Sequence, residues 1–373
     1  MSASDTAVKL GTVRDEIDSI DRQMLELISA RARCALRVAE IKSGSTDPEE
    51  QEHDDFYRPA REAQILRLVQ ETNPGPLSGE TVARLFREII SACLALEGPL
   101  KVAYLGPAGT FTEAAAYKHF GHFVDTKPQA AIDEVFREVD SGAANYGVVP
   151  IENSTEGVIN HTLDEFLHSS LKICGEVSLR VHHQLLSRCK NKADIQAIYA
   201  HGQALAQCRK WLDMNMPGVE RIAVGSNAEG AIRAADKDNC AAIASEGAGH
   251  IYGLTIVASN IEDEPDNTTR FLVIGRQVVP QSGDKLGSDM TSIVAAAPNK
   301  AGMLQDLIEP FSTHGVSMTR IESRPSRKEA WDYVFFIDIQ GHVDDPKVRT
   351  ALESVKDSAT LFKVLGSYPA AVL

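Results

Sequence analysis

A regular pattern of apolar residues near the N-terminus limits the possible folds more than any other feature of the chain. From Thr12 to about Lys42, apolar side chains recur at alternating intervals of three and four positions, at Val13, Ile17, Ile20, Met24, Leu27, Cys34, Val38 and Ile41. This spacing predicts one long amphipathic helix with a seam like that of a coiled coil.

Two further helices are predicted before residue 98. One starts at Pro59, a residue favoured at the first helical position, and stops before the turn residues Asn73 and Pro74. The next starts after a Ser78 cap and carries apolar residues at Val82, Leu85, Phe86, Ile89, Cys93 and Leu96. Because three such helices cannot close all their apolar faces within ~98 residues, the pattern indicates a partner chain.

The pattern changes after Gly98 and Pro99, which break the helical periodicity. From Lys101 onward, short β-branched runs alternate with helical stretches, as is typical of α/β domains. Strands are predicted at 101–105, 146–149, 173–181, 195–199, 221–224, 241–244 and 271–274. About 175 residues of this kind fit a two-lobed α/β domain built on parallel sheets.

A third pattern follows the linker at 279–288, which contains Pro, Gly and Ser. Strands are expected at 291–297, 316–322, 331–339 and 362–368, and helices at 302–314 and near 346–355. This βαββαβ order is that of an α+β ferredoxin-like unit, for which about 80 residues suffice. The chain is therefore expected to be multidomain, with an all-α domain at 8–98, the α/β domain at 100–278 and the α+β domain at 288–369.

Composition excludes several kinds of function. The formal net charge of -14 argues against nucleic acid or an anionic membrane as the main partner, because both favour clustered Lys and Arg. Six cysteines lie far apart without a CxxC pair, and no metal-ligand spacing appears, so neither a metal nor another cofactor is expected. The N-terminus lacks the pattern of a signal peptide, which predicts a cytoplasmic protein.

Arg31 stands at a seam position of the first helix, where an apolar residue is expected. A buried arginine requires an anion. Lys42 lies about 20° away around the helix and roughly 16 Å along it, so both cations can reach one pocket. The pattern alone leaves two interpretations about equally open, namely a pocket for an anionic ligand and an ion pair with Glu62 or Glu97.

Residues 10–97 resemble the all-helical chorismate mutase domain, whose functional pattern is matched by Arg14, Arg31, Lys42, Arg61, Glu62 and Glu97. In that family two arginines hold the carboxylates of chorismate, and one of them reaches across from the other subunit of an intertwined dimer. The resemblance gives this role to Arg14. It lies roughly 25 Å from Arg31 along one helix, so the two cannot meet one small ligand within a single chain.

The same resemblance assigns roles in the rearrangement. The reaction is pericyclic, so the enzyme fixes a compact conformer and stabilises charge on the breaking ether oxygen. Lys42 and Glu97 would donate to that oxygen. Glu62 would hold the ring hydroxyl, and Arg61 would support the pocket. Arg58 stands where the family often has an aspartate.

Three segments of the second domain, 106–112, 150–154 and 267–271, lie beside the ends of predicted strands, where open α/β sheets bind ligands. The amides of 106–112 could receive a carboxylate, although by itself this loop is better interpreted as a plain strand-to-helix turn. Together with 199–208, these segments resemble prephenate dehydratase over residues 101–275. The sequence Thr269, Arg270, Phe271 is the most specific part of the match.

This resemblance implies a fold like that of periplasmic solute-binding proteins, with prephenate in the cleft between the lobes. Thr269 would be the catalytic hydroxyl, and the substrate would be contacted by Asn153, Gln207 and Arg270. Aromatisation drives the loss of carbon dioxide and the ring hydroxyl, so the enzyme mainly needs to polarise the leaving hydroxyl.

Other residues near these motifs receive a structural interpretation. The histidines His182, His183 and His201 are better explained as structural or surface residues than as catalytic ones. Ala200 stands where the prephenate dehydratase family commonly has a serine, so one hydrogen bond of the family is expected to be missing.

The βαββαβ unit contains two motifs, at 299–304 and 322–325. They resemble the phenylalanine-binding motifs of ACT domains attached to prephenate dehydratases. The resemblance implies an allosteric L-phenylalanine site formed by Gly302, Met303, Leu304, Glu322, Ser323 and Arg324. By pattern alone, Gly302 is a residue at a helix N-terminus, and Arg324 lies at a strand end.

The order mutase, dehydratase, ACT domain is that of the bacterial bifunctional P-protein family. It implies conversion of chorismate to prephenate and of prephenate to phenylpyruvate, with release of CO2 and water and feedback inhibition by L-phenylalanine. The family implies a homodimer or homotetramer with intertwined mutase helices. Two alternatives are a monofunctional dehydratase with a degenerate mutase domain and a non-catalytic amino-acid sensor. The first is opposed by Arg14, Arg31, Lys42 and Glu97, and the second by Thr269 and Arg270.

Overall fold

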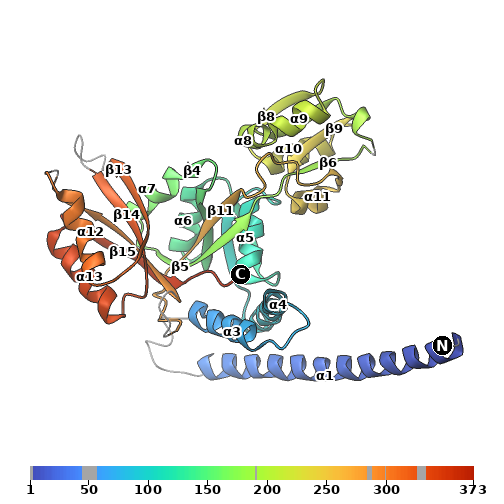
Figure 1. Ribbon diagram of the computed structural model, residues 1–373, viewed down its shortest axis with the longest axis horizontal. Helices are drawn as coiled ribbons and strands as arrows, with labels where there is room; N and C mark the ends of the chain where they lie inside the picture. The colour runs from blue at the N-terminus through green and yellow to red at the C-terminus, as the bar shows by residue number, and fades with distance from the viewer. Residues whose placement is uncertain (1–2, 44–56, 190, 284–287, 299, 326–332) are drawn as a thin grey trace.

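A computed structural model describes residues 3–43, 57–189, 191–283, 288–298, 300–325 and 333–373, without the side chains at the ends of the first range. Figure 1 shows a helical part at the N-terminal end, a two-lobed α/β domain, and an α+β unit beside one of the lobes. In the part of the chain that the structure describes, no helix is both long and apolar enough to cross a membrane.

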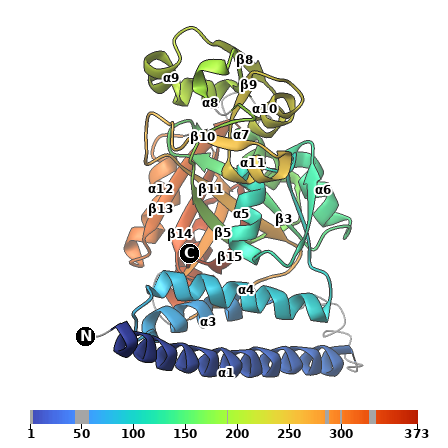
Figure 2. The same cartoon turned by 90° about the vertical axis from the view of Figure 1, so that its right-hand side faces the viewer.

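The helical part consists of α1 (Ala3–Ser43), α3 (Pro59–Thr72) and α4 (Gly79–Glu97). The predicted start at Pro59 and the Ser78 cap are confirmed, since the Ser78 hydroxyl accepts from the amide of Thr81 at 3.1 Å. The first helix starts earlier than predicted, at Ala3. It lies along the outside of α4 (Figure 2). Its apolar seam is 45–73% exposed at Val13, Ile17, Ile20, Met24, Leu27, Val38 and Ile41.

The first lobe is built on a sheet of strand order β2-β1-β3-β11-β5, to which β4 adds at β3. Its strands are β1 (Lys101–Leu105), β2 (Asp125–Gln129), β3 (Tyr146–Asn153), β4 (Gly157–Val158), β5 (Lys172–Arg180) and β11 (Thr268–Gly275). Its helices are α5 (Phe111–Phe120), α6 (Ile132–Asp140) and α7 (Asn160–His168).

The second lobe is built on the order β10-β6-β9-β7-β8. Its strands are β6 (Gln184–Ser187), β7 (Ala197–His201), β8 (Glu220–Val224), β9 (Cys240–Ala244) and β10 (Thr255–Ala258). Its helices are the 3₁₀ turn η1 (Lys192–Asp194), α8 (Gly202–Gln207), α9 (Arg209–Asn215), α10 (Asn227–Ala235) and α11 (Glu246–Tyr252).

The prediction of parallel sheets is wrong for both lobes, which are mixed. Strands β1, β2 and β3 are parallel, but β11 runs antiparallel to both β3 and β5. In the second lobe β6 is antiparallel to β9 and β10. The chain crosses between the lobes twice, at 181–183 and at 259–267, and each crossing leads directly into a strand without the helix that a parallel pair requires.

The α+β unit contains β12 (Asp289–Ala296), α12 (Met303–Thr313), β13 (Met318–Pro325), β14 (Tyr333–Gln340), α13 (Pro346–Ser358) and β15 (Leu361–Pro369). The predicted βαββαβ order is confirmed, with an antiparallel sheet of order β13-β14-β12-β15. Both helices pack on one face. The other face forms a single core with the first lobe, in which Val294, Phe336 and Leu365 join Phe166 and Ile173.

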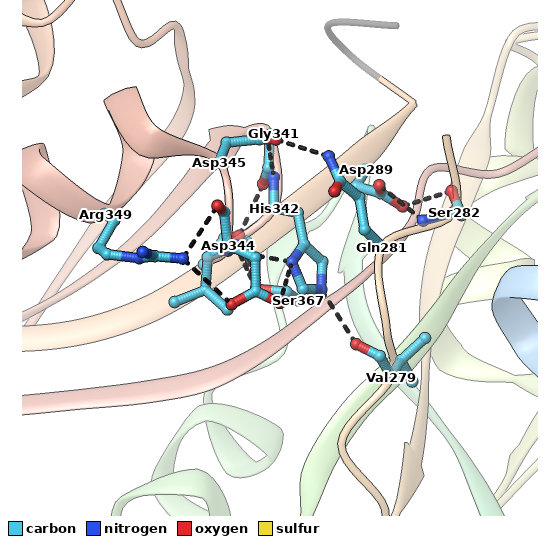
Figure 3. A network of polar contacts seen from close by, with 12 residues as sticks. Val279, Gln281, Ser282, Asp289, Gly341, His342, Asp344, Asp345, Arg349 and Ser367 are labelled. Carbon is cyan, nitrogen blue, oxygen red and sulfur yellow. Dashed lines mark hydrogen bonds and ion pairs between the residues drawn. The ribbon is translucent and has the colours of Figure 1, made fainter. Parts of the chain in front are cut away.

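The linker at 279–283 is fixed to the α+β unit by polar contacts (Figure 3). The buried His342 accepts from the amide of Asp344 at Nδ1, so its Nε2 carries the proton donated to the carbonyl of Val279 at 3.0 Å. Ser282 donates to both carboxylate oxygens of Asp289. Arg67 of α3 reaches the same place and donates to the Ser282 hydroxyl at 2.8 Å, so the helical part is tied to this linker as well.

Candidate active sites

A cavity of about 490 Å³ lies between the two lobes. Its walls come from loops at the strand ends, and the first lobe contributes Thr110, Asn153 and Thr269. The second lobe contributes Gln207 and Asn227. The structure therefore brings together the motif residues that the sequence predicted for a cleft, with the exception of Arg270.

Thr269 and Asn153 are a directly opposed pair on β11 and β3. The register skips one residue here, so that Ile151 is unpaired and forms a β-bulge. Bulges re-aim side chains next to active sites. Asn153 Nδ2 donates to Thr269 Oγ1 at 2.8 Å. Because this oxygen accepts a bond, its own proton is available to donate into the cleft.

Gln207 of α8 binds one residue of the first lobe and two residues of the segments that cross between the lobes. Its Oε1 accepts from Asn267 Nδ2 at 3.2 Å and lies 2.9 Å from His183 Nε2. Its Nε2 donates to Glu156 at 3.4 Å. Asn267 in turn accepts from Asn153, so a continuous hydrogen-bonded chain leads from Gln207 to Thr269.

His183 is a cleft residue that the sequence interpretation missed. It is 2% exposed, lines the cavity, and packs edge-on against Phe111. Burial lowers the pKa of His183, although the hydrogen bond to Gln207 opposes this shift. Since Gln207 Oε1 can only accept, His183 Nε2 carries the proton and Nδ1 is an acceptor. Among the described side chains, Nδ1 has no partner.

The loop at 106–112 interlocks the lobes instead of presenting a free amide at Gly109. The Gly109 amide donates to Glu113 Oε2 at 2.6 Å. Gly109 has φ +84°, and a Cβ atom there would lie 2.9 Å from the backbone of Ala248, so only glycine fits this approach. Ser245 donates to the Gly109 carbonyl at 2.7 Å. This supports the interpretation of the loop as a structural turn.

Arg270 points away from the cleft, contrary to its predicted contact with substrate. Successive residues of a strand face opposite sides of the sheet, and Thr269 occupies the cleft side. The Arg270 guanidinium instead binds Glu176 of β5, Asp338 of β14 and the hydroxyl of Tyr368. Ala200 is fully buried in the core of the second lobe and does not line the cavity.

In the helical part, the candidate mutase residues differ in their burial and in the groups that they contact. Glu62 is buried and binds Arg87 at 3.0 Å, a partner that the sequence interpretation did not include. Burial raises the pKa of Glu62, whereas Arg87 lowers it, with a smaller contribution from Arg31. Arg31 reaches the carbonyl of Ile89 at 3.5 Å. Arg14 is exposed on α1.

The remaining mutase candidates are Lys42, Glu97 and Arg61. Lys42 lies in α1, but its side chain is outside the described residues. Glu97 is the last residue of α4. Arg61 is exposed, donates to Gln64 at 3.3 Å, and lines a cavity of about 250 Å³ that faces residues 277–281. Of the candidate carboxylates, Glu62 lies near enough to Arg31 for the arginine to affect its pKa.

The two motifs of the α+β unit lie on different elements. Gly302 has φ +85° and caps α12, with open space where a Cβ atom would stand. On the edge strand β13, burial alternates, so that Glu322 and Arg324 lie on the covered side and Ser323 on the exposed side. Arg324 binds Asp164 of α7 at 2.6 Å. Asn299 of the first motif lies outside the described residues.

The described residues hold no group of three His, Cys, Asp or Glu side chains arranged to hold a metal ion. A helical part with buried charges, a two-lobed domain with a polar cleft and a ferredoxin-like unit on its flank define a multidomain enzyme. Family models match these parts in order: chorismate mutase type II over residues 13–98, prephenate dehydratase over 102–278 and the ACT domain over 291–357.

The chain belongs to the bifunctional chorismate mutase/prephenate dehydratase family, and it is therefore an enzyme with both activities. It is 56% identical to such a protein from Stutzerimonas stutzeri over 368 residues, which cover 98% of this chain and 99% of that one. The Pseudomonas aeruginosa relative is also 56% identical, over 366 residues that cover 98% of this chain and 99% of that one.

A solved structure resembles the two C-terminal parts. It is the prephenate dehydratase of Arthrobacter aurescens in complex with L-Phe, which is 33% identical to this chain with a TM-score of 0.67. The match covers 74% of this chain and 93% of that protein. The βαββαβ unit is accordingly called the ACT unit below.

Proposed function

We propose that prephenate binds in the cleft between the lobes and that Thr269 donates a hydrogen bond to its ring hydroxyl. This hydroxyl must gain a proton to leave as water, while the carboxylate on the same ring leaves as CO2 and the electron pair completes the aromatic ring. The observation that supports this role is the bond from Asn153 Nδ2 to Thr269 Oγ1, which turns the threonine proton toward other acceptors.

In the same proposal, the amide chain of Asn153, Asn267 and Gln207 orients the substrate and the threonine together. A preorganised set of dipoles stabilises developing charge without reorganising during the reaction. His183 Nδ1 supplies an acceptor beside this chain. Arg270 is left out of the substrate site because its guanidinium binds Asp338 and Glu176.

For the mutase, we propose that two chains complete each active site. The exposed seam of α1 needs an apolar partner, and a second α1 supplies one with the same spacing. Arg31, Lys42, Glu62 and Glu97 would come from one chain and Arg14 from the other. The resulting homodimer, alone or paired into a homotetramer, would bury the seam and bring Arg14 to the site of its partner.

For regulation, we propose that L-phenylalanine binds the ACT unit and inhibits the enzyme. The open space at Gly302 and the exposed side of β13 at Ser323 would form the site between ACT units of two chains. We also propose that the enzyme works in the cytoplasm, where the six cysteines, all free in the structure, would stay reduced.

One pair of variants tests the two catalytic assignments. Thr269→Ala should lower prephenate dehydration by 10²-fold or more, roughly the contribution of one positioned proton donor, so that supplied chorismate accumulates as prephenate. Arg31→Ala should abolish formation of prephenate but leave the dehydration of supplied prephenate intact. Both steps are measured on each folded variant by following prephenate and phenylpyruvate. Loss of both activities in either variant would contradict the assignment of separate sites.

A further inference from the structure

The paired strands β3 and β11 present two faces at the point where the catalytic pair stands. Thr269 is opposite Asn153, and these two side chains face the cleft. The next pair in the register is Arg270 opposite Glu152. Their side chains leave the sheet on the other side, which we call the back face.

The back face is bound by charged residues of the ACT unit. Arg270 donates to Asp338 of β14 at 2.6 Å, and Glu152 binds Arg320 of β13 at 3.0 Å. Arg320 also lies 4.0 Å from Asp338. Glu176 of β5 binds the remaining side of Arg270 at 2.8 Å. These side chains form the back-face cluster, in which charges alternate: Glu176, Arg270, Asp338, Arg320 and Glu152.

The back-face cluster contributes more to the orientation of the ACT unit on the first lobe than to the stability of their contact. Asp338 and Arg320 have side chains only 6% and 12% exposed, and removing such charges from water offsets most of their attraction. The apolar core that the ACT unit shares with the first lobe already supplies adhesion. The charged contacts add directional constraints, because each carboxylate accepts along defined directions. Ser292 fixes the other oxygen of Asp338 at 2.6 Å.

The catalytic pair needs such constraints because it stands at the strand ends. Asn153 is the last residue of β3, Thr269 is the second of β11, and the bulge at Ile151 separates them from the regular ladder. A hydrogen bond between side chains at such a place depends on how the two backbones are held. The adjacent residues, Glu152 and Arg270, are the ones that the ACT unit holds.

We propose that Asp338 and Arg320 of the ACT unit are positioning residues for the dehydratase: by holding Arg270 and Glu152, they keep Asn153 and Thr269 in hydrogen-bonding register on the opposite face. The inference rests on the proposed role of Thr269. It means that the ACT unit forms part of the dehydratase active-site scaffold even when no effector is bound.

The test uses the full chain and three variants. Asp338→Asn and Arg320→Gln remove one charge each from the cluster. Asp164→Asn is the matched control, because Asp164 also forms an ion pair between the first lobe and β13, through Arg324, but does not belong to the back-face cluster. For each variant, kcat and KM are measured with prephenate, and circular dichroism and mutase activity of the same sample together report that the chain is folded.

Asp338→Asn and Arg320→Gln should lower the dehydratase kcat roughly tenfold to a hundredfold, the effect of misplacing a catalytic group by about 1 Å, with little change in KM. Asp164→Asn should keep the parental kcat, and all three should keep mutase activity. Asp338→Asn should also have a smaller effect on kcat in a Thr269→Ser background than alone, because both changes act on one hydroxyl.

Failure of the role proposed for Thr269 can be distinguished from failure of the positioning role proposed for Asp338 and Arg320. If Thr269→Ala retains dehydratase activity, the proposed function of Thr269 is wrong, and the positioning role falls with it. If Thr269→Ala is inactive but Asp338→Asn and Arg320→Gln behave like Asp164→Asn, only the present inference is overturned. Equal losses of kcat in all three variants would also overturn it, because they would show general weakening of the junction.

Discussion

At the residue scale, Gln207 connects the two lobes around the cleft. Its oxygen accepts from Asn267 and His183, both on the segments that cross between lobes, and its nitrogen donates to Glu156 of the first lobe. The hydrogen bonds of this one amide therefore depend on how the two lobes lie relative to each other. Anything that removes one of its partners should disturb the cleft without unfolding either lobe.

His183 offers a test of this arrangement. His183→Leu should lower kcat/KM for prephenate about tenfold, the effect of losing one buried hydrogen bond, and should leave mutase activity unchanged. His182→Leu is the control, since His182 binds Glu262 and is 41% exposed. Steady-state kinetics of both variants measure the difference. Equal effects from the two histidines would show that the bond to Gln207 does not matter.

The motifs predicted Thr269, Asn153 and Gln207 in the cleft, but they could not distinguish His183 from His182. The two histidines lie in an irregular crossing segment, where no periodicity of strand or helix sets which side chain turns inward. For Arg270, the motif predicted a contact with substrate that the structure does not place in the cleft. It belongs to the same motif as Thr269, yet strand alternation sends it to the back face, where two of its partners, Asp338 and Tyr368, come from a domain that starts after residue 278.

At the element scale, the helix α1 was predicted, apart from its earlier start at Ala3, because a heptad-like spacing is a local property of the chain. The edge strand β2 was missed because its sequence, with Pro128 and no β-branched run, carries little strand signal. The antiparallel entry of β11 was also missed. It depends on where the chain returns from the second lobe, and local patterns do not contain that information.

The seam can be tested by placing a charge on it. Leu27→Glu should convert the proposed dimer to monomers and abolish mutase activity, because a buried carboxylate without a partner opposes helix pairing. Leu25→Glu is the control, since Leu25 is 67% exposed on α1 but lies outside the seam. Analytical ultracentrifugation and the mutase assay measure both effects. A dimeric, active Leu27→Glu protein would rule out the seam as the interface.

The packing of α5 against the segment before α3 should make stability depend on pH. Burial, and secondarily the charge of Arg87, lowers the pKa of His119 to about 3, from an ordinary value of 6.5. The Tyr57 hydroxyl is hydrogen bonded to this ring at 3.1 Å. Between pH 6.5 and about 3 the unfolded chain binds a proton that the folded chain excludes, so stability should fall as the pH falls through this window.

His119→Gln should therefore lose less stability than the parent on acidification. The midpoint of urea unfolding, measured at several pH values within the window, reports the slope. His122→Gln serves as the control, because His122 lies nearby but its side chain is 68% exposed. Identical slopes for the parent and His119→Gln would show that another group titrates.

At the scale of the whole molecule, the ACT unit and the first lobe share one apolar core and the back-face cluster. A ligand that prefers one arrangement of paired ACT units would thus act on the dehydratase directly. Such a ligand shifts the equilibrium only by its difference in affinity for the two states. The proposed inhibition by phenylalanine therefore requires contacts at the ACT unit that change with activity.

Ser323→Leu should weaken inhibition by phenylalanine at least tenfold, because a bulky side chain on the exposed side of β13 would fill the proposed site, a loss of about 1.4 kcal/mol of binding free energy. Activity without phenylalanine should not change. Ser358→Leu, at the exposed last residue of α13, is the control. Calorimetry and inhibition curves measure both variants. Parental affinity in Ser323→Leu would place the sensor elsewhere.

Residues 370–373 lie where all three parts of the molecule meet. Ala371 donates to Glu176 of the first lobe, Gln70 of α3 donates to the carbonyl of Val372, and Leu373 packs near Leu66. The ribosome makes these residues after every segment that they contact. The helical part and the dehydratase can therefore fold earlier during synthesis, whereas the contacts of residues 370–373 form only after all three parts have been made.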